Sequence, residues 1–313
     1  MKIIRCIYEL IGNIFCLPGI VKCVLRYGAV LLFLGVYAPA ALSGEPGQPV
    51  QADGRKTSAQ KNNSLDALFN VYQPYLENIS GYEPVYFLMG ADPAKTKFQI
   101  SFKFKIFNHN SPFVNEHSWL EGIHFAYTQT SFWNLASASW PFEDTSYKPE
   151  FFFLSNNLYS GNEIINYLFL QAGIQHESNG RAEMESRSTN TVYIEPIMIR
   201  FNEEKMLGIE LTPRFWTYVA NEKETNWDLN DYRGNFALKL KVGRADRLVL
   251  ESHFRPAREG NSVQVDLTYP IGRYLSDSLN IYFHAQYANA LAESLLHYKE
   301  RTEAVRFGIS IIR

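Results

Sequence analysis

The stretch Phe98-Gln99-Ile100-Ser101-Phe102-Lys103-Phe104-Lys105-Ile106 decides the fold of this chain. Every even-numbered residue in it is apolar and every odd-numbered residue is polar. Successive side chains of a β-strand point to opposite faces of a sheet. A two-residue period therefore predicts a strand with one oily face and one wet face.

The same alternation recurs along the chain from about residue 83 to the end. The twelve predicted strands are 83–90, 97–107, 118–129, 147–154, 166–176, 188–201, 206–219, 231–242, 247–255, 261–270, 279–288 and 301–312. A soluble β-sandwich would also alternate, with its apolar face inside. Two features favour a membrane barrel instead: an even number of strands of about ten residues, and aromatic residues near strand ends. These aromatic residues are Trp119, Tyr127, Trp216, Tyr218, Tyr269 and Tyr287. We predict an all-β fold, a twelve-stranded antiparallel transmembrane β-barrel of the bacterial outer membrane over 81–313.

Composition agrees with this prediction. The 313 residues carry a net charge of -2, which argues against nucleic acid as a partner because that would require a basic face. The chain holds 19 Tyr and 22 Phe, yet its mean hydropathy is only -0.21. A protein with many membrane helices would be more apolar, whereas a barrel exposes only alternate residues to lipid.

The N-terminus has the order of features found in a secretory signal peptide. Positive charges at Lys2, Arg5, Lys22 and Arg26 precede the apolar run 29–42 and the small-residue stretch at 41–43. We expect a signal peptide at 1–43 that directs export to the outer membrane of a Gram-negative cell. An uncleaved anchor is the alternative. All three cysteines, Cys6, Cys16 and Cys23, lie before the expected cleavage site, so the exported chain would have no disulfide. Residues 44–80 should be disordered, apart from a short amphipathic helix at 64–75.

If the N-terminus is periplasmic, the connections after odd-numbered strands are extracellular. These connections include 130–146, 177–187, 220–230 and 289–300, and most are longer than the turns at 202–205 and 243–246. Long outer loops and short inner turns are expected of such barrels. The turn at 108–117 is longer than this rule prefers.

One predicted hairpin, 166–201, carries residues that could perform chemistry. His176 and Ser178 continue the apolar, lipid-facing phase of the fifth strand, and Asn190 has the same phase on the sixth. Polar groups on a lipid face are costly and point to a function. A serine beside a histidine supports nucleophilic acyl transfer, with the asparagine orienting the imidazole. A plain hairpin loop is the alternative, since Ser and Asn are common in turns.

The residues of this hairpin resemble a known family. His-Glu-Ser-Asn-Gly-Arg at 176–181, with Ser-Arg-Ser-Thr-Asn at 186–190, resembles the active-site hairpin of bacterial outer membrane phospholipase A. Further matching stretches lie at 127–129, 133–135, 139–142, 147–150 and 293–296, and Tyr298 also matches. The resemblance covers roughly 80–313. Glu177 stands where the family is expected to have Asp, and the final residues, Ile-Ile-Arg, differ from the aromatic end common in such barrels.

The resemblance implies a calcium-dependent phospholipase with A1 and A2 activity, which hydrolyses acyl esters of phospholipids and lysophospholipids in the outer leaflet. It assigns Ser178 as the nucleophile, His176 as the general base and Asn190 as the residue that orients the base. It also implies a homodimer whose calcium ion is bound by the Arg181 carbonyl, the Ser186 hydroxyl and Ser139 from the partner subunit. Such hard oxygen ligands suit calcium.

The family pattern further places Gln129 at the dimer interface, although a glutamine at the aqueous end of its strand would look the same. We expect His124, His253, His284 and His297 to face the lumen or lie in loops. A lumen salt-bridge network should contain Glu83, Glu210, Glu251, Lys239, Lys241, Arg214 and Arg233. The competing functional hypothesis is a non-catalytic barrel, either a small pore or a structural protein.

Overall fold

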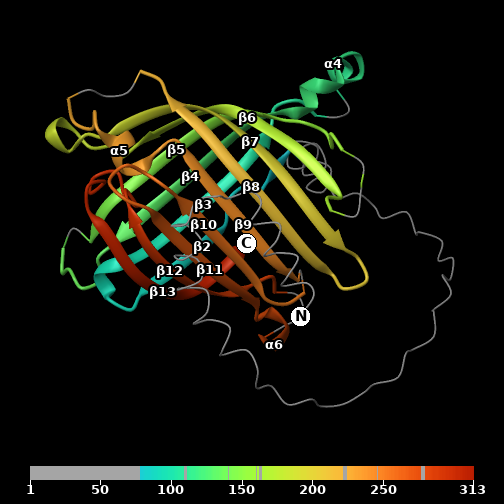
Figure 1. The fold of residues 1–313 in the computed structure, drawn as a ribbon. Helices are drawn as coiled ribbons and strands as arrows, with labels where there is room; N and C mark the ends of the chain where they lie inside the picture. The colour runs from blue at the N-terminus through green and yellow to red at the C-terminus, as the bar shows by residue number, and fades with distance from the viewer. Residues whose placement is uncertain are drawn as a thin grey trace, which may run out of the picture. The chain divides into compact units, whose positions relative to one another are not determined.

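The barrel is closed by hydrogen bonding between its first and last long strands. The computed structural model describes residues 78–313 except 109–110, 140, 160, 162–163, 221–223, 245 and 276–278. The predicted signal peptide and the helix at 64–75 lie outside these residues. Twelve antiparallel strands, β2 to β13, each pair with the next, and β13 pairs with β2. The twelve-stranded barrel predicted from the alternation is therefore confirmed (Figure 1).

The strands of the described residues have the following bounds. They are β1 Ile79–Ser80, β2 Val85–Gly90, β3 Thr96–Lys105, β4 Ile123–Trp133, β5 Phe142–Leu154, β6 Tyr167–Ser178, β7 Ser188–Asn202, β8 Leu207–Tyr218, β9 Phe236–Arg244, β10 Val249–Arg255, β11 Ser262–Pro270, β12 Tyr282–Leu291 and β13 Arg301–Ile312. The two-residue β1 pairs with β3 next to the ring.

Three strands begin five residues away from their predicted starts. The stretch Ser118–Gly122 is the 3-10 helix η2 rather than the start of β4, which instead continues to Trp133. Strand β5 begins at Phe142, five residues before its predicted start. The predicted start of β9 is occupied by the helix α5, Leu229–Arg233. All three differences lie at the rims of the barrel, where both faces of the chain meet water and alternation loses its contrast.

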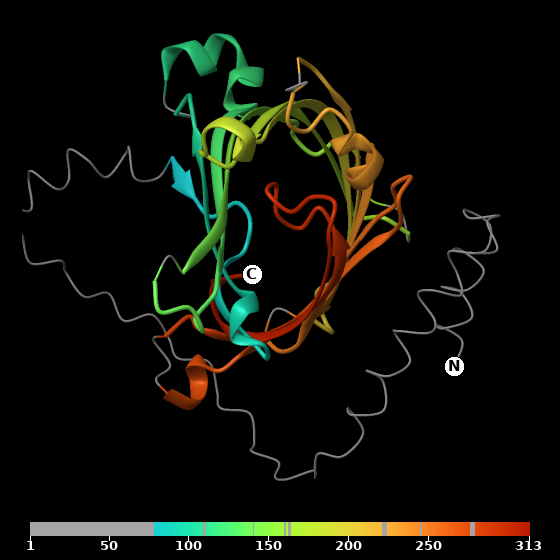
Figure 2. The same ribbon diagram turned by 90° about the vertical axis from the view of Figure 1, so that its left-hand side faces the viewer.

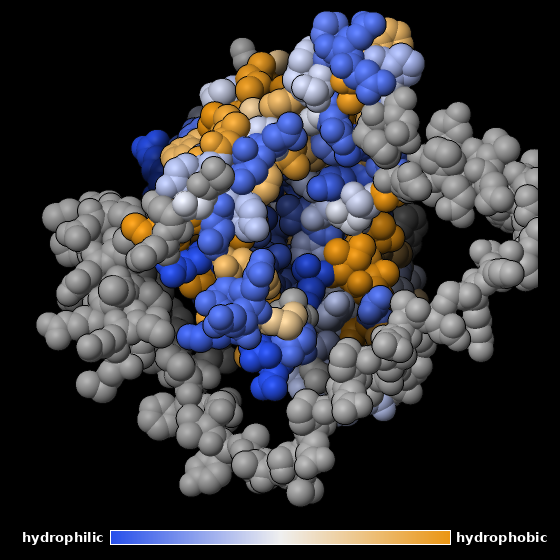
Figure 3. Space-filling view, turned by 90° about the vertical axis from the view of Figure 1, so that its right-hand side faces the viewer, coloured by the Kyte–Doolittle hydropathy of each residue, from blue (hydrophilic) through white to orange (hydrophobic). Residues whose placement is uncertain are grey.

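The two faces of the sheet have opposite polarity. Outward positions carry exposed apolar side chains, including Phe102, Phe151, Ile194, Phe307 and Ile309. Inward positions are polar, and buried examples are Ser101, Thr128, Glu150, Gln286 and Arg306. A view onto one end shows hydrophilic residues around a central hollow and hydrophobic residues on the flank (Figure 3). Among the residues described, no helix is long and apolar enough to cross a membrane.

The two ends of the barrel carry different helices. We call the end with the 179–187 connection the hairpin end; it also carries α5 and the 3-10 helices η1, Pro93–Lys95, and η3, Glu183–Glu185. The helix α4, Pro112–Glu116, lies at the opposite end (Figure 1), and so does α6, Gly272–Leu275. At the hairpin end, the connection between β12 and β13 bends into the ring (Figure 2).

Connection lengths do not distinguish the two ends in the way the sequence suggested. The hairpin end has the connections 179–187, 219–235 and 292–300. The opposite end has tight turns at 203–206 and 245–248, but also the long connections 106–122, 155–166 and 271–281. The length of 106–122 follows from its content, because it houses both α4 and η2.

Candidate active site

The hairpin of β6 and β7 brings His176 and Asn190 together. The two residues are direct partners in the antiparallel register. Both residues share the outward phase of their strands. Ile174, two residues before His176, and Val192, two residues after Asn190, are exposed outward-facing residues. The side chains therefore project on the apolar side of the barrel, near its hairpin end, as the alternation predicted.

A hydrogen bond fixes the orientation of the His176 ring. Its Nδ1 lies 2.8 Å from Oδ1 of Asn190. The Asn190 amide nitrogen donates to the Ala220 carbonyl oxygen at 3.2 Å, which leaves the amide oxygen facing the ring. An amide oxygen only accepts, so Nδ1 carries the proton and Nε2 keeps its lone pair. The geometry thus presents His176 as a base at Nε2.

Ser178 lies on the same outward face as His176, two residues further along β6. It is the register partner of Ser188 on β7 and of Tyr147 on β5. The structure records no hydrogen bond between the Ser178 hydroxyl and the His176 ring, both of which are described. The arrangement holds the histidine and the asparagine in contact and places the serine next to them on the same strand.

Glu177, between these two residues, faces the lumen and anchors the end of β6 there. Its side chain is 7% exposed and forms an ion pair with Arg233 of α5 at 2.5 Å. Its Oε1 accepts a hydrogen bond from the buried Ser146 hydroxyl at 2.6 Å, and Lys148 Nζ lies 3.8 Å from the same oxygen. The alternation along β6 places Glu177 on the face opposite His176 and Ser178, but nothing in the sequence indicates this anchor.

Asn179 braces the connection that follows. This residue is 4% exposed. Its Oδ1 accepts from the backbone N–H groups of Arg181 and Arg187 at 3.3 and 3.0 Å. Its amide nitrogen donates to the Glu185 carbonyl oxygen at 2.9 Å. One side chain thereby satisfies three backbone groups and fixes the shape of the loop 179–187.

Gly180 makes the turn possible. Its φ of +66° lies in the left-handed region, which glycine adopts without steric cost. A Cβ at this position would lie 3.0 Å from the ring of Tyr147. The turn after Ser178 therefore accepts a side chain only with strain and with movement of Tyr147.

The oxygen atoms predicted to bind calcium are available in this loop. Within the described residues, neither the Arg181 carbonyl nor the Ser186 hydroxyl has a hydrogen-bond partner in the protein. The surroundings are acidic: the Arg181 guanidinium lies near Glu185 at 2.5 Å and Asp144 at 4.0 Å. A buried oxygen of Asp144 also lacks a hydrogen-bond partner. Two free hard oxygen donors are of the kind that a calcium ion prefers.

Ser139 and Gln129 lie apart from this loop within one chain. Ser139 is exposed in the connection between β4 and β5, where its carbonyl oxygen accepts from Ser137 at 2.5 Å. Among the hydrogen bonds and ion pairs of the described residues, none joins Ser139 to Arg181 or Ser186. Gln129 faces outward on β4; its Oε1 accepts from the Tyr127 hydroxyl at 3.0 Å. The register runs from Gln129 to Tyr147 and from Tyr147 to Ser178, so Gln129 is two strands away from Ser178.

The connection 292–300 supports the hairpin end from inside. Glu293 forms ion pairs with Lys97 at 3.2 Å and with Arg306 at 2.8 Å. Burial alone would raise the pKa of Glu293, but these two cations lower it to about 2. The backbone N–H of Leu296 donates to Asp144 at 2.9 Å, which ties this connection to the start of β5.

An apolar cluster completes this support. Ala292, Leu295 and Tyr298 of the connection are buried against Leu229 of α5, with Tyr232 alongside. The same helix carries Arg233, the partner of Glu177. The packing of 292–300 on α5 thus reinforces the anchor behind the proposed catalytic strand.

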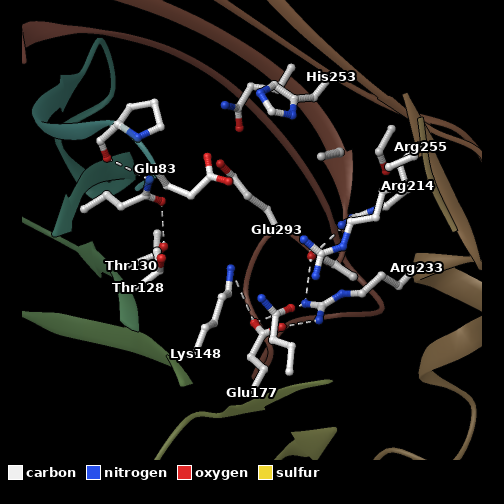
Figure 4. Close-up of a pocket in the computed structure, with 18 of the residues that line it drawn as sticks. Glu83, Thr128, Thr130, Lys148, Glu177, Arg214, Arg233, His253, Arg255 and Glu293 are labelled. Atoms are coloured by element: carbon white, nitrogen blue, oxygen red, sulfur yellow. Dashed lines mark hydrogen bonds and ion pairs between the residues drawn. The ribbon is translucent and has the colours of Figure 1, made fainter. Parts of the chain in front are cut away.

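The predicted lumen network is present in part. Lys241 pairs with Glu251 at 2.6 Å. Arg214 and Arg233 pair with acids outside the predicted set, Glu195 at 3.4 Å and Glu177 at 2.5 Å. Among the ion pairs of the described residues, none involves Glu83, Glu210 or Lys239. Figure 4 shows the cavity in the lumen, with Lys148, Glu177 and Arg233 grouped together. The predicted histidine placements hold: His124, His253 and His284 face inward, and the ring of His297 contacts Glu300 in a loop at 3.1 Å.

Comparison with known proteins agrees with the geometry. The family model of phospholipase A1 matches residues 69–311. A Neisseria meningitidis serogroup B protein with a provisional phospholipase A1 name is 30% identical over 232 residues, which cover 69% of this chain and 54% of the relative. Phospholipase A1 of Escherichia coli K12 is 26% identical over 191 residues, 59% of this chain and 61% of the relative. The chain therefore spans less than two thirds of the length of these two relatives.

Solved structures share the fold. The outer membrane phospholipase A of Escherichia coli superposes with a TM-score of 0.60 at 22% identity, covering 77% of this chain and 97% of that one. The outer membrane phospholipase of Salmonella typhi, a dimer with bound calcium, gives a TM-score of 0.61 at 22% identity, covering 78% and 96%. With most of its barrel matched by the family model, the chain belongs to the phospholipase A1 family.

Proposed function

We propose that this chain is a calcium-dependent phospholipase of the bacterial outer membrane that hydrolyses acyl esters of phospholipids and lysophospholipids. The observation that carries the proposal is the contact between His176 and Asn190 on the apolar side of the barrel. The same residues inside the barrel lumen, or on a water-soluble protein, would not be in contact with membrane lipid. On the outward face of a membrane barrel, ester groups of lipids can reach it directly.

The chemistry follows from the placement of three side chains. Ser178 Oγ attacks the acyl carbonyl carbon, and its proton passes to Nε2 of His176. Asn190 holds the neutral ring in the Nδ1–H tautomer and keeps its hydrogen bond to Nδ1 once Nε2 is protonated. The carbonyl re-forms as the ester bond to glycerol breaks, and the departing glycerol oxygen takes the proton from His176. A water molecule then cleaves the acyl-serine, with His176 again accepting the proton, and releases a fatty acid.

The calcium site is assigned to the loop braced by Asn179. Its proposed ligands are the Arg181 carbonyl and the Ser186 hydroxyl, together with Ser139 of the partner subunit. Bound calcium supplies positive charge beside the oxyanion that develops on the ester carbonyl. The protein's own contribution is to hold two unpaired oxygen atoms in a fixed loop.

A homodimer is part of the proposal because one subunit holds only part of the calcium site. Gln129 is assigned to the dimer interface: its amide faces the apolar side, two strands from Ser178. A polar amide on a lipid face is unfavourable unless it finds partners. Tyr127 donates to its oxygen, and its amide nitrogen donates to Ser131 at 3.4 Å. A neighbouring subunit can accept the second N–H of the amide. Dimerisation when phospholipid reaches the outer leaflet would switch on activity.

Replacement of the nucleophile tests the proposal. Ser178→Ala should abolish lipid hydrolysis while the folded barrel persists, and Ser188→Ala, its register partner, should keep activity. Products are separated by thin-layer chromatography with calcium and with a chelator. A sulfonyl fluoride should label Ser178 in the active protein. Full calcium-dependent activity of Ser178→Ala would exclude it as the nucleophile.

The non-catalytic pore remains the competing function, and the lumen argues against it. Long charged side chains and the connection 292–300 occupy the interior. Barrels of roughly this strand number are filled rather than open. Conductance measurements on the protein in planar bilayers should therefore show no stable open channel.

A further inference from the structure

Positive charge gathers in the lumen at the hairpin end. The cations there are Lys97, Lys148, Arg233, Arg255 and Arg306, and the carboxylates that pair with them are Glu177 and Glu293. Glu293 serves both Lys97 and Arg306, and Glu177 serves both Arg233 and Lys148. These five cations thus have only two carboxylates as direct partners. Other carboxylates line the same cavity, but Glu150, Glu251 and Asp266 are held by other side chains. A buried charge is costly unless it is paired, so this region favours a further negative charge.

Arg255 is the cation that these carboxylates leave out. Among the described residues it has no ion pair. Its Nη2 donates to two backbone carbonyl oxygens, those of Leu291 at 2.5 Å and Ala292 at 3.4 Å. Its Nε is buried without a hydrogen-bond partner, and among the described residues no hydrogen bond is recorded for its Nη1. A charged donor of the guanidinium group therefore remains available on the cavity side.

Lys148 is the second incompletely paired cation. Its Nζ lies 3.8 Å from Glu177, beyond hydrogen-bond distance, whereas Arg233 contacts the same carboxylate at 2.5 Å. Arg233 is thus the closer partner of Glu177, and the ammonium of Lys148 makes no direct hydrogen bond to that carboxylate.

These side chains line one cavity of about 350 Å³. Lys148, Arg233 and Arg255 all border it, and Figure 4 shows them converging from β5, α5 and β10 around the same space. We propose that this end of the lumen binds a small inorganic anion, an oxyanion such as phosphate, between these three residues. Arginine forks match the oxygen geometry of phosphate and sulfate, and the ammonium of Lys148 adds a point charge.

The proposed anion has a structural consequence. It neutralises the excess charge behind Glu177 and allows Arg233 to keep its full interaction with that carboxylate. The site is separate from the calcium loop, because its residues face the lumen and those of the loop do not enter it. It is independent of whether Ser178 is the nucleophile.

Unfolding experiments with defined salts test this proposal. The full-length protein, folded in non-ionic detergent without calcium, is unfolded by urea at pH 7 while sodium phosphate replaces the sodium salt of a bulky organic buffer at constant ionic strength. A ligand that binds only the folded state raises the unfolding midpoint as its concentration increases. We expect a saturable rise, and an apparent affinity about tenfold or more weaker in Arg255→Gln because a charged donor is lost.

Two further variants make the result decisive. Arg244→Gln alters an exposed cation at the opposite end, paired with Asp246, and should respond to phosphate like the wild type. If Arg255→Gln does not fold, Lys148→Gln provides the same comparison. A parallel titration with chloride distinguishes an oxyanion site from a general halide site. A saturable rise with phosphate that depends on Arg255 or Lys148 supports the proposal, and a rise with chloride alone would overturn the oxyanion assignment. Equal midpoints with and without both anions, or the same rise in the variants, would overturn it.

Discussion

Glu177 and Arg233 form an ion pair inside the barrel, while the neighbours of Glu177 in sequence, His176 and Ser178, face outward. The strand end that presents the proposed catalytic residues to lipid is thus held in place from the lumen. Because side chains alternate along a strand, the anchor and the reactive groups occupy consecutive positions without competing for space.

Loss of this anchor should reduce activity without removing any group that touches substrate. Glu177→Gln leaves Arg233 with an unpaired charge and should cost about 2 kcal/mol of stability. A shift of the strand end by about 1 Å can lower turnover by about a hundredfold, so a tenfold or greater fall in kcat with a smaller change in KM is expected. Steady-state kinetics and urea unfolding measure the two effects.

Glu195→Gln is the matched control. Glu195 is also a lumen carboxylate paired with an arginine, Arg214, but it lies seven positions from the rim end of β7. It should destabilise the barrel without the fall in kcat. Equal kinetic losses in both variants would show that Glu177 acts only through general stability.

The Asn190 contact predicts a change in pH dependence. In Asn190→Asp a carboxylate replaces the neutral amide beside Nδ1 of His176, and it stabilises the protonated ring. The base then loses its proton only at higher pH, so the acidic limb of the kcat/KM profile should move upward in pH. Asn190→Ala removes the contact and should lower kcat about a hundredfold without such a displacement. Unchanged profiles in both variants would remove Asn190 from the mechanism.

The loop bracing by Asn179 predicts a calcium phenotype. Asn179→Ala removes three hydrogen bonds, each worth about 1 kcal/mol, from the loop that holds the proposed calcium ligands. The calcium concentration for half-maximal activity should rise at least about tenfold. Direct calcium binding by calorimetry provides a second measurement.

Asn157→Ala is its control, because Asn157 also accepts backbone hydrogen bonds in a connection, but at the opposite end of the barrel. Its calcium response should match that of the wild type. A normal calcium response in Asn179→Ala would separate the loop from the metal site.

The ion pairs of Glu293 predict a loss of stability in acid. Its pKa is about 2 in the folded barrel, below the ordinary value of 4.5. A lowered pKa contributes stability that is complete above the unfolded value and is lost as the pH falls toward the folded value. The unfolding midpoint should therefore drop between about pH 5 and pH 2. Glu293→Gln should be less stable at pH 7 and should show a flatter dependence over this range; parallel curves would exclude the effect.

The barrel could be predicted because lipid and water impose opposite requirements on the two faces of each strand. The alternation in 98–106 needs no knowledge of any other segment. Alternation did not predict the strand at 142–146. The inward-facing residues there, Asp144 and Ser146, alternate in sequence with outward-facing residues that are also polar. At the rim water covers both faces, so the sequence gives no contrast from which a strand could be predicted.

The features of the site that follow from which face of a strand a residue occupies could be predicted. Those that depend on residues far away in the sequence could not. The shared face of His176, Ser178 and Asn190 follows from two adjacent strands. The anchor of Glu177 requires Arg233, 56 residues further on, and the support by Glu293 requires the connection 292–300 to fold inward. Neither partner has a local signal, because both depend on how the closed sheet brings distant loops together.

The alternation along β6 also limits how this segment can evolve. A single residue inserted or deleted between 171 and 176 would invert the placement of everything up to the turn. Glu177 would then face the hydrocarbon of the membrane, and His176 and Ser178 would face the lumen. Only insertions or deletions of two residues at a time would keep each side chain on its face. Natural variation in this stretch should therefore consist almost entirely of substitutions.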